Sequence, residues 1–277
     1  MADADGALPI AAENPMTEYP RATSRQRRPW LFALGPQDPP ERFSLHGEDF
    51  RRLTVFKHDF FAATTLYEGA GAKVVLKIGR TYPLFGLPME WIGRILCFHE
   101  CRLFSLVRDI DGIPKLTGRV GPTGLVHEFA EGRPLAKGDV VADDFFPRLE
   151  SMLAAIHRRQ AAYVDFEKRE NILHGADGRP WLIDFQISWH VPDARGGRCW
   201  PARRWLAVLQ AADRYHLLKH WRRLRPDQLD TRELDESHFA PTWIRWHRAI
   251  FRPLTMMRRR LLVRLGARTS AKLRSPG

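Results

Sequence analysis

Short apolar and β-branched runs, separated by a glycine-containing turn, dominate residues 53–80. Residues 62–67 are apolar and rich in threonine, and residues 74–78 read Val-Val-Leu-Lys-Ile, a composition typical of β-strands. Residues 68–72, Glu-Gly-Ala-Gly-Ala, lie between these runs and predict a turn. We therefore expect two or three β-strands here, one of which carries Lys77 in its interior.

Apolar residues take up a helical spacing further along the chain. A helix is predicted from about Glu90 to Val107, with an imperfect apolar stripe formed by Trp91, Ile95, Phe98, Leu103 and Leu106. Residues 143–157 have the same period and predict a core helix. Residues 205–212 and 215–221 predict further helices, and the basic residues near them are interpreted as a solvated face or as a platform for an anionic substrate.

Further short apolar runs predict strands in two regions, residues 113–129 and residues 163–188. Residues 113–116 and 125–129 read as two strands, the second closed by residues 132–135. Within residues 163–188, apolar runs at 172–173 and 181–183 flank Gly-Ala-Asp-Gly, a turn signal. This stretch predicts a loop, a strand, a tight turn and a second strand, after which Asp184 follows.

The polar residues of this stretch suit phosphoryl transfer. In such a reaction the protein positions a hydroxyl, holds metal ions against the phosphates and neutralises charge. One carboxylate is needed near the nucleophile, while Mg²⁺ prefers oxygen ligands such as an amide and a second carboxylate. Asp165, Asn171 and Asp184 supply these groups. An ordinary β-hairpin with surface acids is the alternative interpretation.

The same residues resemble the protein-kinase-like superfamily. Lys168 stands three residues before Asn171, and the pair Asp184–Phe185 follows Asn171 at 13 residues. The segment Leu-Ile-Asp-Phe-Gln is similar to the corresponding segment of bacterial atypical kinases of the RIO-like and lipopolysaccharide-core branches. The resemblance covers about residues 53–220. It implies an α+β, bilobal protein-kinase-like fold: a small antiparallel β N-lobe plus helix, and a mainly helical C-lobe with a catalytic-loop hairpin.

The resemblance implies a nucleotide site in the first half of the chain. Lys77 would contact the α- and β-phosphates of ATP, and Glu100 would orient Lys77, with Glu90 as the competitor for that role. Gly69 and Gly71 would belong to the turn over the nucleotide, where backbone N–H groups can approach phosphate. A plain hairpin turn is the alternative for these two glycines.

The linker between the lobes is implied by the phrase Val-His-Glu-Phe-Ala-Glu-Gly. Backbone groups of Glu128, Phe129 and Ala130 would hydrogen-bond the adenine there. This part of the resemblance requires no particular side chain, so composition does not test it.

The catalytic residues follow from the same resemblance. Asp165 would orient the acceptor hydroxyl, Lys168 would stabilise charge on the transferred phosphoryl group, and Asn171 and Asp184 would bind Mg²⁺. Asp165 lies six residues before Asn171, whereas the common protein-kinase loop has five, so Phe166 falls at the base position. Because phenylalanine cannot accept a proton, we assign Asp165, with a one-residue insertion before Lys168.

Other parts of the protein-kinase pattern are missing from the sequence. No His-Arg-Asp or Ala-Pro-Glu triplet is present, and Gln186 replaces the glycine that usually follows Asp-Phe. Without the triplet that marks the base, Glu167 is the alternative to Asp165 for that role. These departures weaken the case for regulation by loop phosphorylation and for a peptide groove. They leave the metal- and phosphate-binding residues intact.

Charge divides the chain unevenly. The net charge is +12, but residues 241–277 contain ten Lys and Arg and no acid, so residues 1–240 carry only +2. We expect a largely disordered arm at residues 1–40 with a docked piece near 30–34, an N-lobe at 41–130, a C-lobe at 131–240 and a basic amphipathic tail at 241–277.

The tail carries tryptophans and a one-sided apolar stripe among its arginines, which suits an anionic membrane surface. A C-lobe core helix is the alternative, and nucleic-acid binding is not expected because no recognition motif accompanies the charge. Three cysteines without zinc-like spacing indicate a reducing compartment. No secretory signal or apolar run of spanning length is visible, so we expect a cytoplasmic protein, with attachment to the inner membrane face left open.

These observations support one main hypothesis and two alternatives. The main hypothesis is an ATP- and Mg²⁺-dependent kinase whose acceptor hydroxyl belongs to a protein Ser/Thr or to a sugar of a membrane glycolipid such as lipopolysaccharide core. The irregular catalytic loop motivates a pseudokinase that binds nucleotide without turnover. A basic interaction protein with an unrelated α+β fold is the third interpretation.

Overall fold

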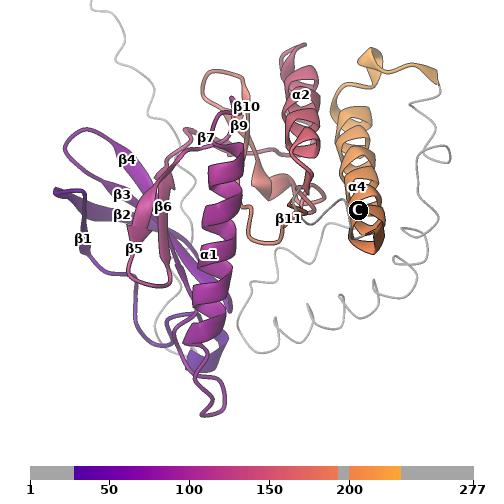
Figure 1. Ribbon diagram of the computed structural model, residues 1–277. Helices are drawn as coiled ribbons and strands as arrows, with labels where there is room; N and C mark the ends of the chain where they lie inside the picture. The colour runs from indigo at the N-terminus through magenta and orange to yellow at the C-terminus, as the bar shows by residue number, and fades with distance from the viewer. Residues whose placement is uncertain (1–27, 193–199, 232–277) are drawn as a thin grey trace, which may run out of the picture.

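The computed structural model describes residues 28–192 and 200–231. Figure 1 shows two parts: an antiparallel sheet with helix α1 along it, and a mainly helical part containing α2, α4 and a small sheet. The expected fold class, α+β with a bilobal arrangement, is confirmed by this division of the strands and helices.

The large sheet is fully antiparallel, with the strand order β1-β2-β3-β4-β6-β5. Its apolar face buries a cluster that includes Phe43, Phe50, Tyr67, Leu76 and Val126. The strands are β1 (Arg42–Leu45), β2 (Glu48–His58), β3 (Ala62–Glu68), β4 (Lys73–Gly79), β5 (Leu116–Val120) and β6 (Gly124–Glu128). Strands β3 and β4 therefore match the apolar runs that predicted them, and Lys77 lies inside β4.

The prediction of a strand at residues 113–116 is wrong. The strand in this region is β5, which begins at Leu116, where the predicted run ends. Ile113 instead belongs to a turn after α1, since its N–H bonds to the carbonyl of Ile110, and its side chain is buried in the main core. Pro114 has no N–H to donate to a strand ladder, which is consistent with a strand that starts after it.

Helix α1 (Glu90–Val107) has the bounds expected from the sequence. It approaches the end of β4 closely at Gly93, where an added Cβ would lie 2.3 Å from the carbonyl oxygen of Arg80. The apolar stripe, however, is wrong in its first half: Trp91, Ile95 and Phe98 are more than half exposed. Small residues, Gly93 among them, face the sheet there, and the larger apolar residues become buried only from Leu103 onward.

The helical part contains one long helix where two were predicted. Helix α4 (Trp200–Leu224) runs without interruption through both apolar runs, and α2 (Phe145–Arg158) packs against it. A three-stranded sheet, β10-β9-β7, is formed by β7 (Gly132–Pro134), β9 (Ile172–Gly175) and β10 (Pro180–Leu182). The remaining elements are the pair β8 (Ala161–Ala162) and β11 (Trp189–His190) and the 3-10 helices η1 (Pro29–Leu31), η2 (Arg169–Asn171) and η3 (Pro226–Gln228).

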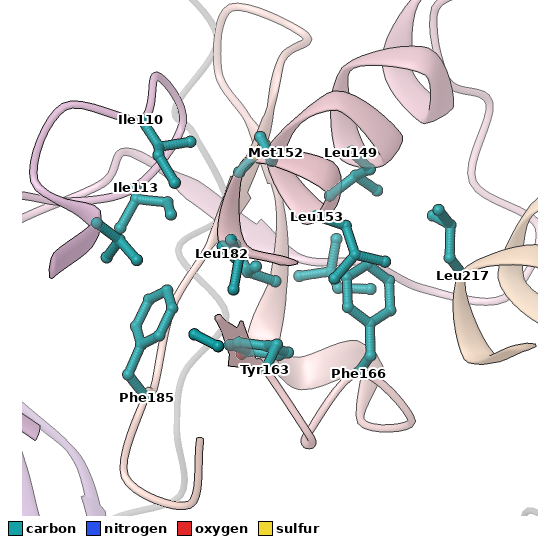
Figure 2. Close-up of a cluster of buried hydrophobic side chains, with 14 of the residues drawn as sticks. Ile110, Ile113, Leu149, Met152, Leu153, Tyr163, Phe166, Leu182, Phe185 and Leu217 are labelled. Atoms are coloured by element: carbon teal, nitrogen blue, oxygen red, sulfur yellow. The ribbon is translucent and has the colours of Figure 1, made fainter. Parts of the chain in front are cut away.

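The main hydrophobic core joins the two parts of the molecule. It combines residues of α1, such as Phe104, with residues of α2, the 163–166 segment, β10 and α4. Figure 2 shows Tyr163, Phe166 and Phe185 lying among leucines that include Leu153 and Leu182. The polar residues of the 163–188 stretch are therefore mounted directly on this core.

Two segments with sequence-based expectations lie partly or wholly outside the described residues. Residues 31–34, within the expected arm, are buried, and the Ala33 N–H donates to the Asp59 carbonyl at 2.7 Å. Residues 1–27 and the basic tail at 241–277 are not described. Within residues 28–192 and 200–231, no helix combines the length and the apolar composition that crossing a bilayer requires.

Candidate active site

Lys77 joins the two parts of the molecule through two ion pairs. Its Nζ lies 2.9 Å from Glu100 Oε1 on α1 and 2.9 Å from Asp184 Oδ1, which follows β10. Lys77 and Glu100 are buried, with 8% and 2% of their surfaces exposed. Three residues that are distant in the sequence thus share one group of charges, as the resemblance implied.

Glu90 does not compete for Lys77. It lies at the exposed start of α1 and pairs with Arg94, one helical turn further on, at 2.7 Å. Glu100 is located on the buried face of the same helix. Of the two glutamates considered from the sequence, Glu100 is therefore the one that contacts Lys77.

The shared ammonium sets the charge states of these groups. Burial disfavours the charged form of Lys77, but Asp184 and Glu100 outweigh this effect and raise its pKa. Burial likewise acts to raise the pKa of Asp184, yet Lys77 is close enough to hold that pKa well below the usual range of a carboxyl. For Glu100 burial dominates, and its pKa is raised even though Lys77 contacts it. Asp184 is therefore an ionised carboxylate at neutral pH.

Two polar side chains of the loop and η2 donate to one carboxylate oxygen of Asp165. Asp165 Oδ2 accepts hydrogen bonds from Lys168 Nζ at 2.6 Å and from Asn171 Nδ2 at 2.8 Å. Phe166 is fully buried in the core beneath the loop (Figure 2), so it does not occupy the position of a base. Glu167 is exposed and pairs with Lys219 at 3.7 Å. The geometry thus brings Asp165, and not Glu167, to Asn171 and Lys168.

The environment of Asp165 favours proton acceptance more than that of an exposed aspartate does. Burial raises its pKa and the negative charge of Asp184 adds to this effect, while Lys168 and Asn171 oppose it. The net pKa is raised from the ordinary value. A carboxylate of raised pKa that still accepts two hydrogen bonds is suited to receive a proton from a nearby hydroxyl.

Asn171 and Asp184 lie at the same end of the β9–β10 hairpin. Leu182 pairs with Ile172, and the next link is a bond from the Ile183 N–H to the Asn171 carbonyl at 3.0 Å. Asp184 has φ = 66°, a left-handed conformation that turns the chain directly after β10. Phe185 follows and packs at 5.2 Å between ring centroids against both Phe104 and Tyr163, which anchors this turn in the core.

These two residues fit a magnesium ion. Asp184 is ionised, and because Asn171 donates its amide nitrogen to Asp165, its amide oxygen is the atom left to face a cation. Among the described residues no group of three or more His, Cys, Asp or Glu side chains could hold a metal. A pair of oxygen ligands is nonetheless what Mg²⁺ uses in nucleotide sites, where phosphates and water complete its shell.

The linker after β6 contains one buried residue, Ala130, whose two backbone groups have no hydrogen-bond partner among the described residues. The N–H of Glu128 donates to the Lys115 carbonyl at 2.9 Å, and the N–H of Phe129 donates to the Lys73 carbonyl at 3.2 Å. Ala130 is buried, yet within the described part of the chain no hydrogen bond uses its N–H or its carbonyl. Because buried backbone groups are normally paired, Ala130 is the linker residue available to a ligand.

Gly69 and Gly71 lie away from the ion pairs, and their place over the nucleotide stays a prediction. They form the turn between β3 and β4, and Lys77 lies six residues beyond Gly71. The part of β4 from Lys73 to Lys77 alone spans about 13 Å at roughly 3.3 Å per residue. Together with Phe129 and Glu131 the turn lines a hollow of about 430 Å³ beside the linker. Two glycines between apolar runs fit any hairpin turn, so the sequence did not distinguish this turn from the one between β2 and β3.

Asp213 on α4 holds the 163–166 segment and was not singled out from the sequence. It has no exposed surface, and it accepts hydrogen bonds from the N–H groups of Tyr163 and Val164 and from His157 Nε2. Val164 has φ = 70°, which is strained for a β-branched residue, and Asp213 secures it in that conformation. The only signal in the sequence was an acid between the two apolar runs, at residues 205–212 and 215–221, that predicted helices.

Comparison with known proteins gives a limited result. No protein-family model matches the chain, and no curated protein sequence matches it. The solved structures with a similar fold include the Rio2 kinase-ADP/Mg²⁺-phosphoaspartate complex from Chaetomium thermophilum, with a TM-score of 0.46 and 14% identity. That match covers 65% of this chain and 56% of the other.

A second structure of Rio2 kinase from the same organism has a TM-score of 0.43 and 13% identity, covering 59% of this chain and 54% of the other. The chain therefore spans just over half the length of these two proteins. At such values the likeness assigns no residue, so the roles proposed below rest on the side-chain geometry.

Proposed function

We propose that this protein is an ATP- and Mg²⁺-dependent phosphotransferase that moves the γ-phosphoryl group of ATP to a hydroxyl acceptor. The observation that carries the proposal is the buried Lys77 ammonium held at 2.9 Å by both Glu100 and Asp184. Burying charges is costly unless they are paired or serve a bound ligand. A lysine that bridges a strand, a helix and a hairpin end is suited to hold phosphates between two lobes.

Each residue has a distinct task in this proposal. Lys77, oriented by Glu100, contacts the α- and β-phosphates, and Asn171 and Asp184 hold Mg²⁺. The ion, when bound, supplies positive charge against the phosphate oxygens. Asp165 orients the acceptor hydroxyl and receives its proton, and its raised pKa suits that role. Lys168, hydrogen-bonded to Asp165, stabilises charge on the transferred group.

The adenine binding site in this proposal is the linker. The Ala130 N–H has no hydrogen-bond partner among the described residues and can donate to a ring nitrogen of the base. The Glu128 carbonyl oxygen lies 2.8 Å from His127 Nδ1, so one hydrogen-bonding position of this carbonyl is already used within the protein. Ala130 is therefore the principal adenine contact, and Glu128 and Phe129 shape the linker through their bonds to the sheet.

The surroundings of the catalytic loop favour an acceptor that carries negative charge. His216, Lys219 and Arg223 recur every three or four residues on α4, where Lys219 pairs with Glu167 at 3.7 Å and His220 on the same face bonds to the Phe166 carbonyl at 2.9 Å. Burial lowers the pKa of Arg169 and nearby Arg223 lowers it further, against the opposing effect of Asp139, so two cations approach each other beside the loop. Such an arrangement is stabilised by an anion, which a phosphorylated glycolipid or an acidic protein segment would supply.

A transfer screen tests this function. The chain is incubated with γ-labelled ATP and Mg²⁺ against membrane glycolipids and generic Ser/Thr protein substrates, with Asp165→Asn as the control variant. Label should enter one acceptor class, and Asp165→Asn should lower the rate by roughly 10²–10⁴-fold, as expected for loss of a general base. Nucleotide binding without transfer to any acceptor would instead favour a pseudokinase scaffold.

We propose in addition that residues 241–277 bring the enzyme to an anionic membrane, which fits a glycolipid acceptor. The support is the sequence itself: ten basic residues and no acid in that segment. Each basic residue near an anionic surface contributes roughly 1 kcal/mol. Removal of the residues after Pro241 should abolish flotation with phosphatidylserine vesicles, and retained flotation would defeat the membrane proposal.

A further inference from the structure

A second lysine lies on the same face of the sheet as Lys77. Lys57 on β2 is directly opposite Thr64 on β3, and Thr64 is directly opposite Lys77 on β4. Directly opposed residues of antiparallel strands project to the same side of a sheet. Lys57 and Lys77 therefore project to the same side, about 10 Å apart at the backbone, since neighbouring strands are spaced by about 4.8 Å.

The charges around Lys57 connect it to the active site. Its Nζ lies 2.8 Å from Asp59 Oδ2, and half of the side chain is exposed. Burial lowers the pKa of Lys57, but carboxylates outweigh it, Asp59 first and then Asp184, so the net pKa is raised. Asp184 therefore acts on Lys57 as well as on Lys77.

The turn that follows Lys57 is held by side chains and has no glycine. Asp59 Oδ1 accepts the N–H groups of Phe61 at 2.9 Å and Ala62 at 3.1 Å. Arg80, fully buried, donates to the Phe60 carbonyl at 2.9 Å and stacks over the Phe60 ring at 4.1 Å. This turn is thus fixed in position between β2 and β3.

The same bonds remove the usual phosphate donors of such a turn. Successive free N–H groups in a turn can cradle phosphate, but here Asp59 already uses those of Phe61 and Ala62. The negative charge of a triphosphate still has to be neutralised on this side of the site. The half-exposed Lys57 is the cation in position to do so, because it projects from the strand that leads into the turn.

We infer that Lys57 is a second phosphate-binding lysine. It contacts the β- and γ-phosphates of ATP from β2, while Lys77 contacts the phosphates from β4. The inference rests on the proposed function, since it assumes that a nucleotide triphosphate occupies the site. Asp59 competes with the phosphates for the Lys57 ammonium and holds it in place when no nucleotide is bound. The lysine thus replaces, by side-chain charge, the backbone donors that this turn does not offer.

Calorimetric titration with ATP and with adenosine tests the inference. Lys57→Gln should weaken ATP binding about tenfold, as expected for one charge-assisted contact, and leave adenosine binding unchanged. Lys57→Arg should retain most of the ATP affinity. The matched control is Arg51→Gln, which removes an exposed cation from the same strand at the end opposite Glu68 and should alter neither ligand. An unchanged ratio of ATP to adenosine affinity in Lys57→Gln would overturn the inference.

Asp59→Asn provides a second, independent test. Asparagine keeps an oxygen for the N–H groups of Phe61 and Ala62 and removes the oxygen that holds Lys57. ATP binding should tighten, and the gain should be larger in the otherwise unmodified chain than in the Lys57→Gln background. Equal gains in both backgrounds would contradict a role for Lys57. Failure of the unmodified chain to bind ATP or adenosine would refute the proposed function itself, and the inference with it.

Discussion

At the scale of single residues, the candidate site depends on carboxylates whose surroundings differ sharply. Asp184 is held ionised by Lys77, whereas the pKa of Asp165 is raised by burial. Asp213 contacts no reacting group in the proposal, and it acts as a positioning residue by accepting three hydrogen bonds beneath the catalytic loop. In the proposed function these three acids have metal-binding, proton-accepting and positioning tasks.

Asp213→Ala should destabilise the protein strongly. It leaves two backbone N–H groups and His157 Nε2 without their buried acceptor, and each unsatisfied buried donor costs about 1–3 kcal/mol. We expect a loss of at least about 3 kcal/mol in the free energy of unfolding, measured in urea. Asp177→Ala, an exposed acid of the β9–β10 turn, is the control and should stay within about 0.5 kcal/mol. Similar effects for the two variants would contradict the positioning role.

At the scale of elements, the two faces of α1 differ. One face carries Glu100, which contacts Lys77, and the other exposes apolar side chains to solvent. Its bounds followed from the sequence, but its orientation did not, because Trp91, Ile95 and Phe98 face solvent. The contact between Gly93 and the Arg80 backbone brings α1 close to β4, and this approach places Glu100 against Lys77.

Substitutions on the two faces of α1 should separate these roles. Ile95→Gln changes an exposed side chain and should alter the free energy of unfolding by no more than about 0.5 kcal/mol. Leu103→Ala removes a buried side chain on the same helix and should cost about 2–5 kcal/mol. Thermal or urea unfolding measures both. A large loss in Ile95→Gln would show that the predicted stripe is buried after all.

Helix α4 should make the fold sensitive to acid through His220. Burial lowers the pKa of His220 to about 4, and its Nε2 bonds to the Phe166 carbonyl. Since the folded pKa lies below the ordinary value of 6.5, the unfolded chain binds more protons between these values. Stability is therefore lost as the pH falls from about 6.5 to about 4, by on the order of 2 kcal/mol.

Urea unfolding at several pH values measures this loss. His220→Gln keeps a side-chain N–H for the Phe166 carbonyl and removes the titrating ring, so the decline between pH 6.5 and 4 should become shallower. Burial also lowers the pKa of His127 to about 4, so part of the decline should remain. An identical pH dependence in the variant and the unmodified chain would be inconsistent with a buried neutral His220.

At the scale of the whole molecule, the sequence specified local chemistry better than spatial relations. Period and turn signals were sufficient for the bounds of α1 and for the β9–β10 hairpin. The inability of Phe166 to accept a proton led to Asp165, which the structure brings to Asn171, while its role stays a prediction. The position of the glycine turn relative to the ion pairs did not follow from the sequence, because strand order decides which hairpin end faces the site. Asp213 and Lys57 depend on contacts between distant segments, so no local pattern could identify them.

The central claim is that Lys77, Asn171 and Asp184 form one nucleotide–magnesium site. The most direct measurement is the rate of γ-phosphoryl transfer by Asp184→Asn, compared with Asp177→Asn on the same hairpin. Loss of a metal ligand removes several kcal/mol of transition-state stabilisation, so Asp184→Asn should be slower by about a thousandfold and Asp177→Asn should be unchanged. Transfer by Asp184→Asn at the rate of the unmodified chain would contradict the account.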